Sequence, residues 1–245
     1  MTPSHSFFQL SELDRTTFPE FRDRALRGEG EGATAEPRSY PGYPRWPLDR
    51  VSPRLWPPLD RVLIARRSAR ALGTDLPARK ALSRLLRVGH GLTASRFRGP
   101  VPSAGGLQAL ELYLVVLESA WLPAGVYHYD RTGHHLAQVV PQAARAEWQE
   151  RVPAMHLVGG GAFLWVLVGD GARVEKKYGE RGYRFLLLEA GHLMQNLCLL
   201  SASMGLVTVP LGGYLEQDLA RALVLPATDV VVYVGVCGKA KVTGG

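Results

Sequence analysis

The sequence predicts an α+β fold in which a sheet packs against one long central helix. Strand-like apolar runs and helical patterns are mixed along the chain, without the strict alternation that a doubly wound parallel sheet requires. Residues 184–204 are apolar almost all round at helical length, which indicates a buried core helix. The 245 residues are 46% hydrophobic and 21% charged, which is typical of a globular protein and excludes a disordered or fibrous chain.

The first 56 residues differ in composition from the rest of the chain. The glycine-rich residues 27–32 are typical of a flexible segment, and residues 37–58 interleave prolines with Tyr40, Tyr43 and two tryptophans. This proline density excludes an ordinary helix or a central strand. The segment either wraps over a surface or binds a partner as polyproline II, and its aromatic side chains favour wrapping. We therefore expect a Pro-rich extension over residues 1–56 and one main domain over residues 57–245.

Regular patterns begin at residue 59. Helical spacing, strand-like runs and turn residues define each element in turn. The expected elements are helices over residues 59–66 and 76–88, a strand over 110–117, a hairpin of strands 125–129 and 136–140, a helix over 143–150, a buried strand over 162–168, the core helix over 184–204, an amphipathic helix over 214–223 and a last strand over 230–236.

Charge and cysteine content narrow the functional classes. The formal net charge is +7, but the basic residues are scattered, so small anionic ligands or an acidic partner are favoured over nucleic acid. Cys198 and Cys237 stand in apolar surroundings and are expected to be buried free thiols. Early carboxylates at Glu12, Asp14 and Glu20 exclude the apolar core of a signal peptide. We expect a cytoplasmic protein that binds neither nucleic acid nor membrane.

Two segments have residue types that suit an anionic ligand. The cluster Arg66, Arg67, Ser68 and Arg70 can donate forked hydrogen bonds to a phosphate; the alternative is a solvated helix end. The small residues 102–106, Pro-Ser-Ala-Gly-Gly, permit close approach of backbone N–H groups to a ligand; a tight turn explains them as well. Neither a Walker loop nor a Gly-x-Gly-x-x-Gly dinucleotide motif is present.

Two further segments suit catalysis and a flat ligand. Lys177 and Tyr178 precede the core helix. A lysine that acts as a general base needs a pKa lowered from about 10.4 towards about 7–8. Desolvation and the nearby arginines would lower it. The alternative for this segment is an exposed charged loop. Residues 211–214, Leu-Gly-Gly-Tyr, either let a flat ligand lie against backbone or form a plain turn. The histidines lack metal-ligand spacing, so no metal site is expected.

In this order, these segments resemble the flavin-dependent nitroreductase superfamily. Within it, the chain is most similar to the SagB/ThcOx-type dehydrogenases, which oxidise azolines to azoles in ribosomal peptide biosynthesis. The likeness extends from about residue 59 to the C-terminus, and the run over residues 177–196 is its most specific part. The matching segments are residues 65–70, 101–107, 111–113, 125–130, 177–185, 189–196, 211–214 and 233–235.

The resemblance implies a nitroreductase-like fold with an antiparallel-rich sheet, assembled as an intertwined homodimer with one FMN at each of two interface sites. Lys177 and Tyr178 match the catalytic Lys-Tyr pair of these dehydrogenases. The implied FMN contacts are Arg66, Arg67, Ser68, Arg70 and Lys239 at the phosphate, with Pro102, Ser103, Ala104 and Gly105 on one side of the isoalloxazine and Leu211, Gly212 and Gly213 on the other.

The implied activity is oxidation of an azoline-type ring in a peptide or other small-molecule substrate. The resemblance assigns Lys177 to removal of the Cα proton, Tyr178 to orienting the ring or helping the proton leave, and flavin N5 to accepting the hydride. The neighbouring Lys176 is an alternative for the catalytic amine. Gln108 and Ala109 depart from the aromatic residue and proline that are common after this loop in the superfamily.

Two other functions stay open at this point. One is a generic NAD(P)H-dependent nitroreductase or quinone reductase, and the other is a non-catalytic scaffold subunit of a biosynthetic complex. The sequence contains no cyclodehydratase segment. If azolines are the substrates, a cyclodehydratase partner would be a separate chain.

Overall fold

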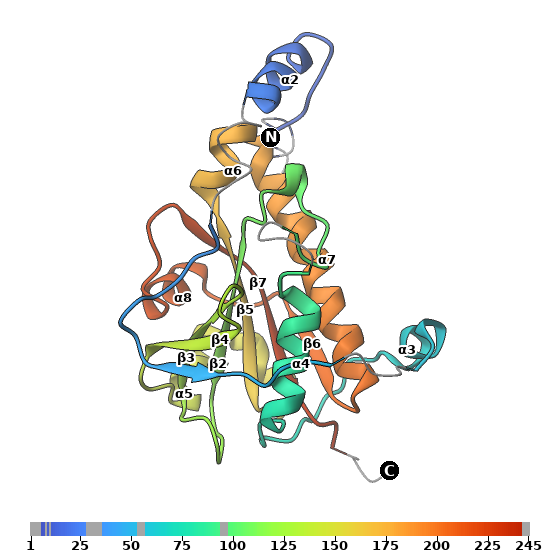
Figure 1. Cartoon of the computed structure of the whole chain (residues 1–245), viewed down its shortest axis with the longest axis vertical. Helices are drawn as coiled ribbons and strands as arrows, with labels where there is room; N and C mark the ends of the chain where they lie inside the picture. The colour runs from blue at the N-terminus through green and yellow to red at the C-terminus, as the bar shows by residue number, and fades with distance from the viewer. Residues whose placement is uncertain are drawn as a thin grey trace.

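A seven-stranded antiparallel sheet forms the centre of the protein (Figure 1). The computed structural model describes residues 6, 7, 9, 11–27, 36–52, 57–93 and 98–241. The strands lie in the order β1-β4-β3-β2-β5-β7-β6, and each neighbouring pair is antiparallel. Their bounds are β1 Arg45–Pro47, β2 Leu110–Val116, β3 Gly125–Asp130, β4 His135–Val140, β5 Phe163–Asp170, β6 Val207–Leu211 and β7 Asp229–Gly238. The predicted α+β class is confirmed.

Helices surround this sheet, and α7 is the longest of those described (Figure 1). The helices are α2 Phe18–Arg27, α3 Leu59–Ala65, α4 Arg79–His90, α5 Arg145–Arg151, α6 Gly171–Tyr178, α7 Arg181–Ser203 and α8 Glu216–Ala222, with short 3₁₀ turns η1 Ala104–Gly106 and η2 Pro153–Leu157. The predicted core helix therefore begins three residues earlier than expected.

Two apolar cores lie on the two faces of the sheet. Along β2, Leu112 and Leu114 point into one core, and Tyr113 and Val115 point into the other, because successive strand residues face opposite sides. Helix α7 packs into the first core, where its Leu193 is fully buried. Each such buried leucine contributes roughly 1.5–3 kcal/mol. Burial on both faces explains the unbroken apolar runs of β2 and β5.

Differences from the predicted elements have local causes. Helix α4 begins at Arg79 rather than at residue 76, because Pro77 disfavours helical geometry in the residue before it. Strand β6 was not predicted; it contains Pro210, which an edge strand tolerates. The segment before the core helix is helix α6, so its interpretation as an exposed loop is wrong.

The Pro-rich segment lies along the sheet over residues 36–52. Its Arg45–Pro47 pairs with β4 as an edge strand, and Tyr40 packs against the second core. Helix α2 lies against α6, where the Phe21 ring stacks on the Tyr178 ring at 6.0 Å between centroids. The predicted flexible residues 27–32 lie largely outside the described residues, and the domain boundary at residue 56 stays a prediction.

Helix α7 is long and apolar enough to cross a membrane, by length and composition alone. The core helix of a globular protein has the same properties, and α7 packs against the sheet. Cys198 and Cys237 are buried free thiols, as predicted.

Candidate active site

An exposed cationic cavity lies where the chain leaves β7. Arg67, Ser68, Arg70 and Lys239 line this cavity, whose volume is about 570 Å³. The end of the chain runs beside the segment after α3, since the Gly73 amide donates to the Lys239 carbonyl at 2.7 Å. This pairing brings Lys239 to the arginine cluster, although the two are far apart in sequence.

The donor set of the cavity suits a phosphate. Its arginine and lysine side chains are exposed and therefore hydrated in the absence of an anion. Guanidinium groups bind phosphate oxygens with paired hydrogen bonds. Arg66 does not line the cavity. It is half-buried and directly follows α3. Its charge partly offsets the burial that raises the pKa of the Cys198 thiol to about 11. The structure therefore brings together three of the four clustered residues with Lys239.

A second group of predicted residues lies at the end of α6. Lys177 is 4% exposed, and its Nζ lies 5.5 Å from the centre of the Tyr178 ring. Asp170 caps this helix by accepting the Arg173 amide at 3.0 Å, and Gly179 ends it at φ +56°. The neighbouring Lys176 is exposed. The fold therefore distinguishes the two adjacent amines, and it is Lys177 that points inward.

Gly105 lies directly against this pair. A Cβ at position 105 would stand 2.8 Å from Lys177 Nζ and would collide with the Tyr178 hydroxyl. Its φ of +55° is also in the left-handed region that favours glycine. Both constraints require glycine here. The loop of residues 102–108, which we call the 102–108 loop, is thus in contact with the lysine and the phenol.

Helix α7 holds the start of the same loop. Glu189 accepts a hydrogen bond from Ser103, and His192 Nδ1 lies 3.4 Å from the Pro102 carbonyl. Burial raises the pKa of Glu189 to about 7, because the Ser103 hydroxyl and the charges of Arg131 and Arg173 compensate only in part. The side of α7 that carries Glu189 and His192 therefore faces the 102–108 loop.

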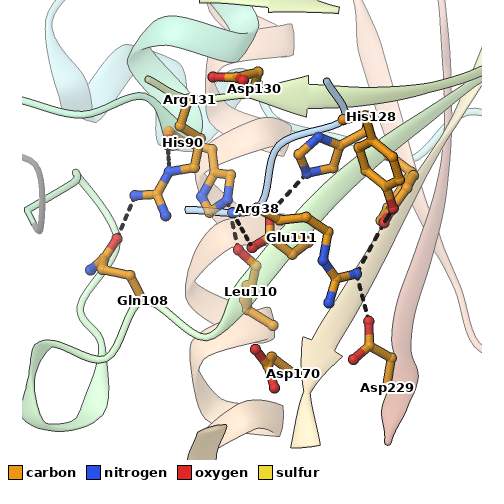
Figure 2. A network of polar contacts seen from close by, with 12 residues as sticks. Arg38, His90, Gln108, Leu110, Glu111, His128, Asp130, Arg131, Asp170 and Asp229 are labelled. Atoms are coloured by element: carbon orange, nitrogen blue, oxygen red, sulfur yellow. Dashed lines mark hydrogen bonds and ion pairs between the residues drawn. The ribbon is translucent and has the colours of Figure 1, made fainter. Parts of the chain in front are cut away.

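A buried polar network lies beside the start of β2 (Figure 2). His128 Nε2 lies 2.9 Å from Glu111 Oε2, and Arg38 Nη1 lies 2.6 Å from Asp229 Oδ2. Arg38 also donates to the Tyr113 hydroxyl at 3.1 Å. Burial raises the pKa of Glu111, but the hydrogen bond and charge of His128, with Arg38, outweigh it and leave the pKa at about 2.

Sequence reasoning missed this network. A usable signal was present, since Glu111 interrupts the apolar run of β2 with a charge that burial forces to find a partner. The partners themselves are distant in sequence. Within the described residues, no group of three or more His, Cys, Asp or Glu is arranged to hold a metal ion.

The third predicted segment, residues 211–213, lies at the end of edge strand β6. The Gly213 carbonyl accepts the Ala154 amide at 3.0 Å, which anchors the segment to η2. Gly212 and Gly213 are exposed, and a Cβ on Gly212 would meet open space among the described residues. This leaves room for a flat ligand to approach the backbone.

The cationic cavity lies at the end of β7, and Lys177 belongs to α6, which lies beyond the start of β7. Figure 1 shows α6 and the end of β7 at opposite ends of the sheet. Lys239 directly follows β7, whereas Asp229 at the start of β7 pairs with Asp170, the residue before α6. The ten residues of β7 span roughly 30 Å at about 3.3 Å per residue. One mononucleotide does not bridge this distance, so the two groups of one chain cannot contact the same FMN.

The fold, together with the family match, defines the class of protein, a nitroreductase-type oxidoreductase. The sequence model of the Nitroreductase family matches residues 63–239, and the chain belongs to this family. The predicted nitroreductase-like fold is confirmed. Members of the family are FMN-dependent oxidoreductases.

Two relatives are informative. The chain is 29% identical over 165 residues to "Putative nitroreductase MJ1384" of Methanocaldococcus jannaschii, covering 67% of this chain and 83% of that protein. It is 27% identical over 144 residues to the microcin B17-processing protein McbC of Escherichia coli, covering 54% of this chain and 51% of McbC.

Solved structures share the fold. A "putative nitroreductase" from Ralstonia eutropha matches with a TM-score of 0.70 at 25% identity, over 86% of this chain and 96% of that one. The E. coli microcin synthetase McbBCD complex with truncated pro-MccB17 contains a chain that matches with a TM-score of 0.62 at 22% identity, over 91% and 87%. An FMN complex of a nitroreductase-fold protein from Exiguobacterium sibiricum matches with a TM-score of 0.56 at 14% identity, over 79% and 93%.

Proposed function

We propose that the protein is an FMN-dependent dehydrogenase that oxidises azoline-type rings to azoles in a ribosomal peptide or related natural product. The observation that carries this proposal is the buried Lys177-Tyr178 pair held against Gly105. The similarity to McbC, a microcin B17-processing protein, supports the substrate class. A separate cyclodehydratase chain would form the ring, and the McbBCD complex is a precedent for such an assembly.

The exposed cavity would hold the phosphate of FMN. Arg67, Ser68, Arg70 and Lys239 supply charges and a hydroxyl that fit a phosphate, and the cavity is open enough to admit it. Leu211, Gly212 and Gly213 of the same chain would line one side of the isoalloxazine. Arg66 would act on the phosphate from outside the cavity.

The other side of each site would come from a second copy of the chain. Pro102, Ser103, Ala104 and Gly105, with the Lys177-Tyr178 pair, are too far from the cavity of their own chain. Exposed apolar side chains on α3 and α7 supply a surface that a second copy could bury. They are Leu59, Leu63, Ile64, Leu187 and Leu188. We therefore infer a homodimer with two composite sites.

In this arrangement, Lys177 and Tyr178 would have separate roles in the reaction. Lys177 would take the Cα proton of the azoline, since its amine is held at the 102–108 loop and shielded from water. Tyr178 would orient the ring through its hydroxyl, which contacts Gly105. The oxidation also needs a hydride acceptor, which FMN supplies when it is bound.

Substitution of the two neighbouring lysines tests the proposal. Lys177→Ala should retain bound FMN but lower azoline turnover by about 100- to 10,000-fold, because a positioned general base contributes that much. Lys176→Ala is the matched control and should turn over like the wild type. Mass analysis of an azoline peptide would measure the loss of one hydride and one proton per ring. Equal turnover in both variants would remove Lys177 from the mechanism.

A nitroreductase or quinone reductase is the second candidate, favoured by the likeness to MJ1384. Rapid bleaching of the bound flavin by NADPH, followed by nitroarene turnover and no azoline oxidation, would establish it. A colourless protein that binds no added FMN would instead support a scaffold role.

A further inference from the structure

The 102–108 loop has an unusual backbone. Gly105, Gly106 and Gln108 all have positive φ values, of +55°, +68° and +50°. Glycine adopts this region readily, whereas a residue with a side chain does so at a cost. Gln108 therefore needs contacts that hold it in place.

Every polar group of Gln108 is engaged. Its amide donates to Ser103 Oγ at 2.8 Å, and its carbonyl accepts from Arg173 Nη1 at 3.2 Å. In the side chain, Oε1 accepts from Arg131 Nη2 at 2.5 Å and Nε2 donates to the Val101 carbonyl at 3.4 Å. An aromatic or aliphatic residue could not make the two side-chain bonds. Gln108 is thus matched to its surroundings rather than tolerated by them.

Arg131 anchors Gln108 from the body of the protein (Figure 2). It is 2% exposed, and its Nε donates to the His90 carbonyl at 2.8 Å. His90 is the last residue of α4, and a cation is favoured at the negative end of a helix. Arg131 follows β3 directly, so the position of its guanidinium is set by the sheet and by α4.

Glu189 anchors the other end of the loop. Its side chain is 4% exposed and bonds to Ser103. Because Ser103 Oγ already accepts the Gln108 amide, its hydroxyl hydrogen is available to the Glu189 carboxylate. The two anchors therefore meet inside the loop, at the Ser103–Gln108 hydrogen bond.

We propose that Ser103, Gln108, Arg131 and Glu189 form a clamp that fixes the 102–108 loop, and with it Gly105, against Lys177 and Tyr178. Gln108, Arg131 and Glu189 are positioning residues, and they act through Ser103 and the loop that contains it. The effect of the clamp on the flavin site depends on the proposed function, whereas its effect on the loop does not.

Hydrogen–deuterium exchange on the purified protein without FMN tests the loop itself. Gln108→Leu removes both side-chain bonds and should speed amide exchange in residues 102–108 by about tenfold or more, the effect of losing a buried hydrogen-bond partner. Gln108→Glu keeps an acceptor for Arg131 and should restore slow exchange. Gln217→Leu, the same change at an exposed glutamine of α8, is the matched control. Unchanged exchange in Gln108→Leu would overturn the clamp.

Glu189 supplies a second, independent variant should Gln108→Leu fail to fold. Glu189→Leu removes the acceptor for Ser103 and should also speed exchange, while Glu189→Gln retains the acceptor and should not. Equal exchange in the two Glu189 variants would overturn that half of the clamp.

The FMN-loaded variants test the link to the site. In Gln108→Leu, the visible circular dichroism of bound flavin should change and kcat should fall more than KM rises, because alignment is lost rather than binding. Faster loop exchange with an unaltered flavin spectrum would overturn this link while leaving the loop clamp itself supported. Absence of FMN binding in the wild type would instead contradict the proposed function, and the exchange results would stand.

Discussion

The two ends of the sheet hold their charges in opposite ways. At the end of β7, Arg67, Arg70 and Lys239 are exposed around an open cavity. At the α6 end, Lys177 and Glu111 are buried and in contact with specific partners. Exposed cations interact weakly until a ligand arrives and are screened by salt. The two ends therefore differ physically: the exposed cations are open to an incoming anion, whereas the buried charges are held in a fixed geometry by their partners.

A second contrast lies within the buried end. Glu111 and Glu189 are 2% and 4% exposed, yet their pKa values are about 2 and about 7. Burial raises both. In Glu111, the His128 hydrogen bond and charge, with the Arg38 charge, reverse the effect, whereas Ser103 offers Glu189 only a neutral hydroxyl. Burial alone does not set the ionisation of a carboxyl group; its partner does.

Removal of Glu111 should have the largest effect on stability. Glu111→Leu leaves His128 and the Arg38 amide without their carboxylate, and breaking a buried pair typically costs about 3–5 kcal/mol. Urea unfolding measures this loss. Glu147→Leu, which breaks the exposed pair with Arg151, should change stability by less than about 1 kcal/mol. Similar losses in the two variants would contradict the contrast between buried and exposed charge.

Glu189 should make stability depend on pH in the opposite direction to Glu111. Its folded pKa of about 7 exceeds the ordinary 4.5, so the folded protein binds the extra proton between these values. This contribution favours folding at low pH and is lost as pH rises from about 4.5 to about 7, on the order of 3 kcal/mol.

Glu189→Gln cannot ionise and should not show this contribution. Unfolding free energies at pH 5 and pH 8 should therefore show the variant gaining on the wild type as pH rises. If both proteins change equally between the two pH values, Glu189 does not titrate as described.

Arg67→Ala should have the smallest effect on the fold and act on FMN instead. Loss of one charged donor to a phosphate should weaken FMN binding by about tenfold or more, and high salt should reduce the difference. Stability without FMN should stay within about 0.5 kcal/mol, as for most exposed positions. Fluorescence titration with FMN at low and high salt measures the effect, with the exposed Arg61→Ala of α3 as control. Equal FMN affinities in Arg67→Ala and Arg61→Ala would show that Arg67 of the cavity does not bind FMN.

Much of the fold follows from local pattern. The buried strands β2 and β5, the hairpin of β3 and β4, and helix α7 were all predictable, because their apolar periodicity is imposed by the sheet they form. The edge strand β6 and helix α6 were not, since Pro210 and a run of charges hide their patterns.

Some features of the candidate site can likewise be predicted from local sequence, and others cannot. The arginine cluster and the glycines of the loops are visible as residue types in sequence. Three features cannot be predicted from the sequence, because each depends on elements distant along the chain. They are the burial of Lys177, the pairing of Glu111 with His128 and the hydrogen bond from Arg131 to Gln108. The sequence shows a glutamine at position 108, but its role in holding the loop follows only from its hydrogen-bond partners in the structure.

In the proposed dimer, each site combines the cavity of one chain with the Lys177 end of the other. Co-expression of a chain carrying Arg67→Ala and Arg70→Ala with a chain carrying Lys177→Ala, under two different tags, would yield purified mixed dimers. With FMN limiting, each mixed dimer should contain one intact site and show about half of the wild-type azoline turnover. The Lys177→Ala parent lacks the base, and the parent with both arginine substitutions binds FMN too weakly to be loaded. Mixed dimers as inactive as their parents would contradict this arrangement.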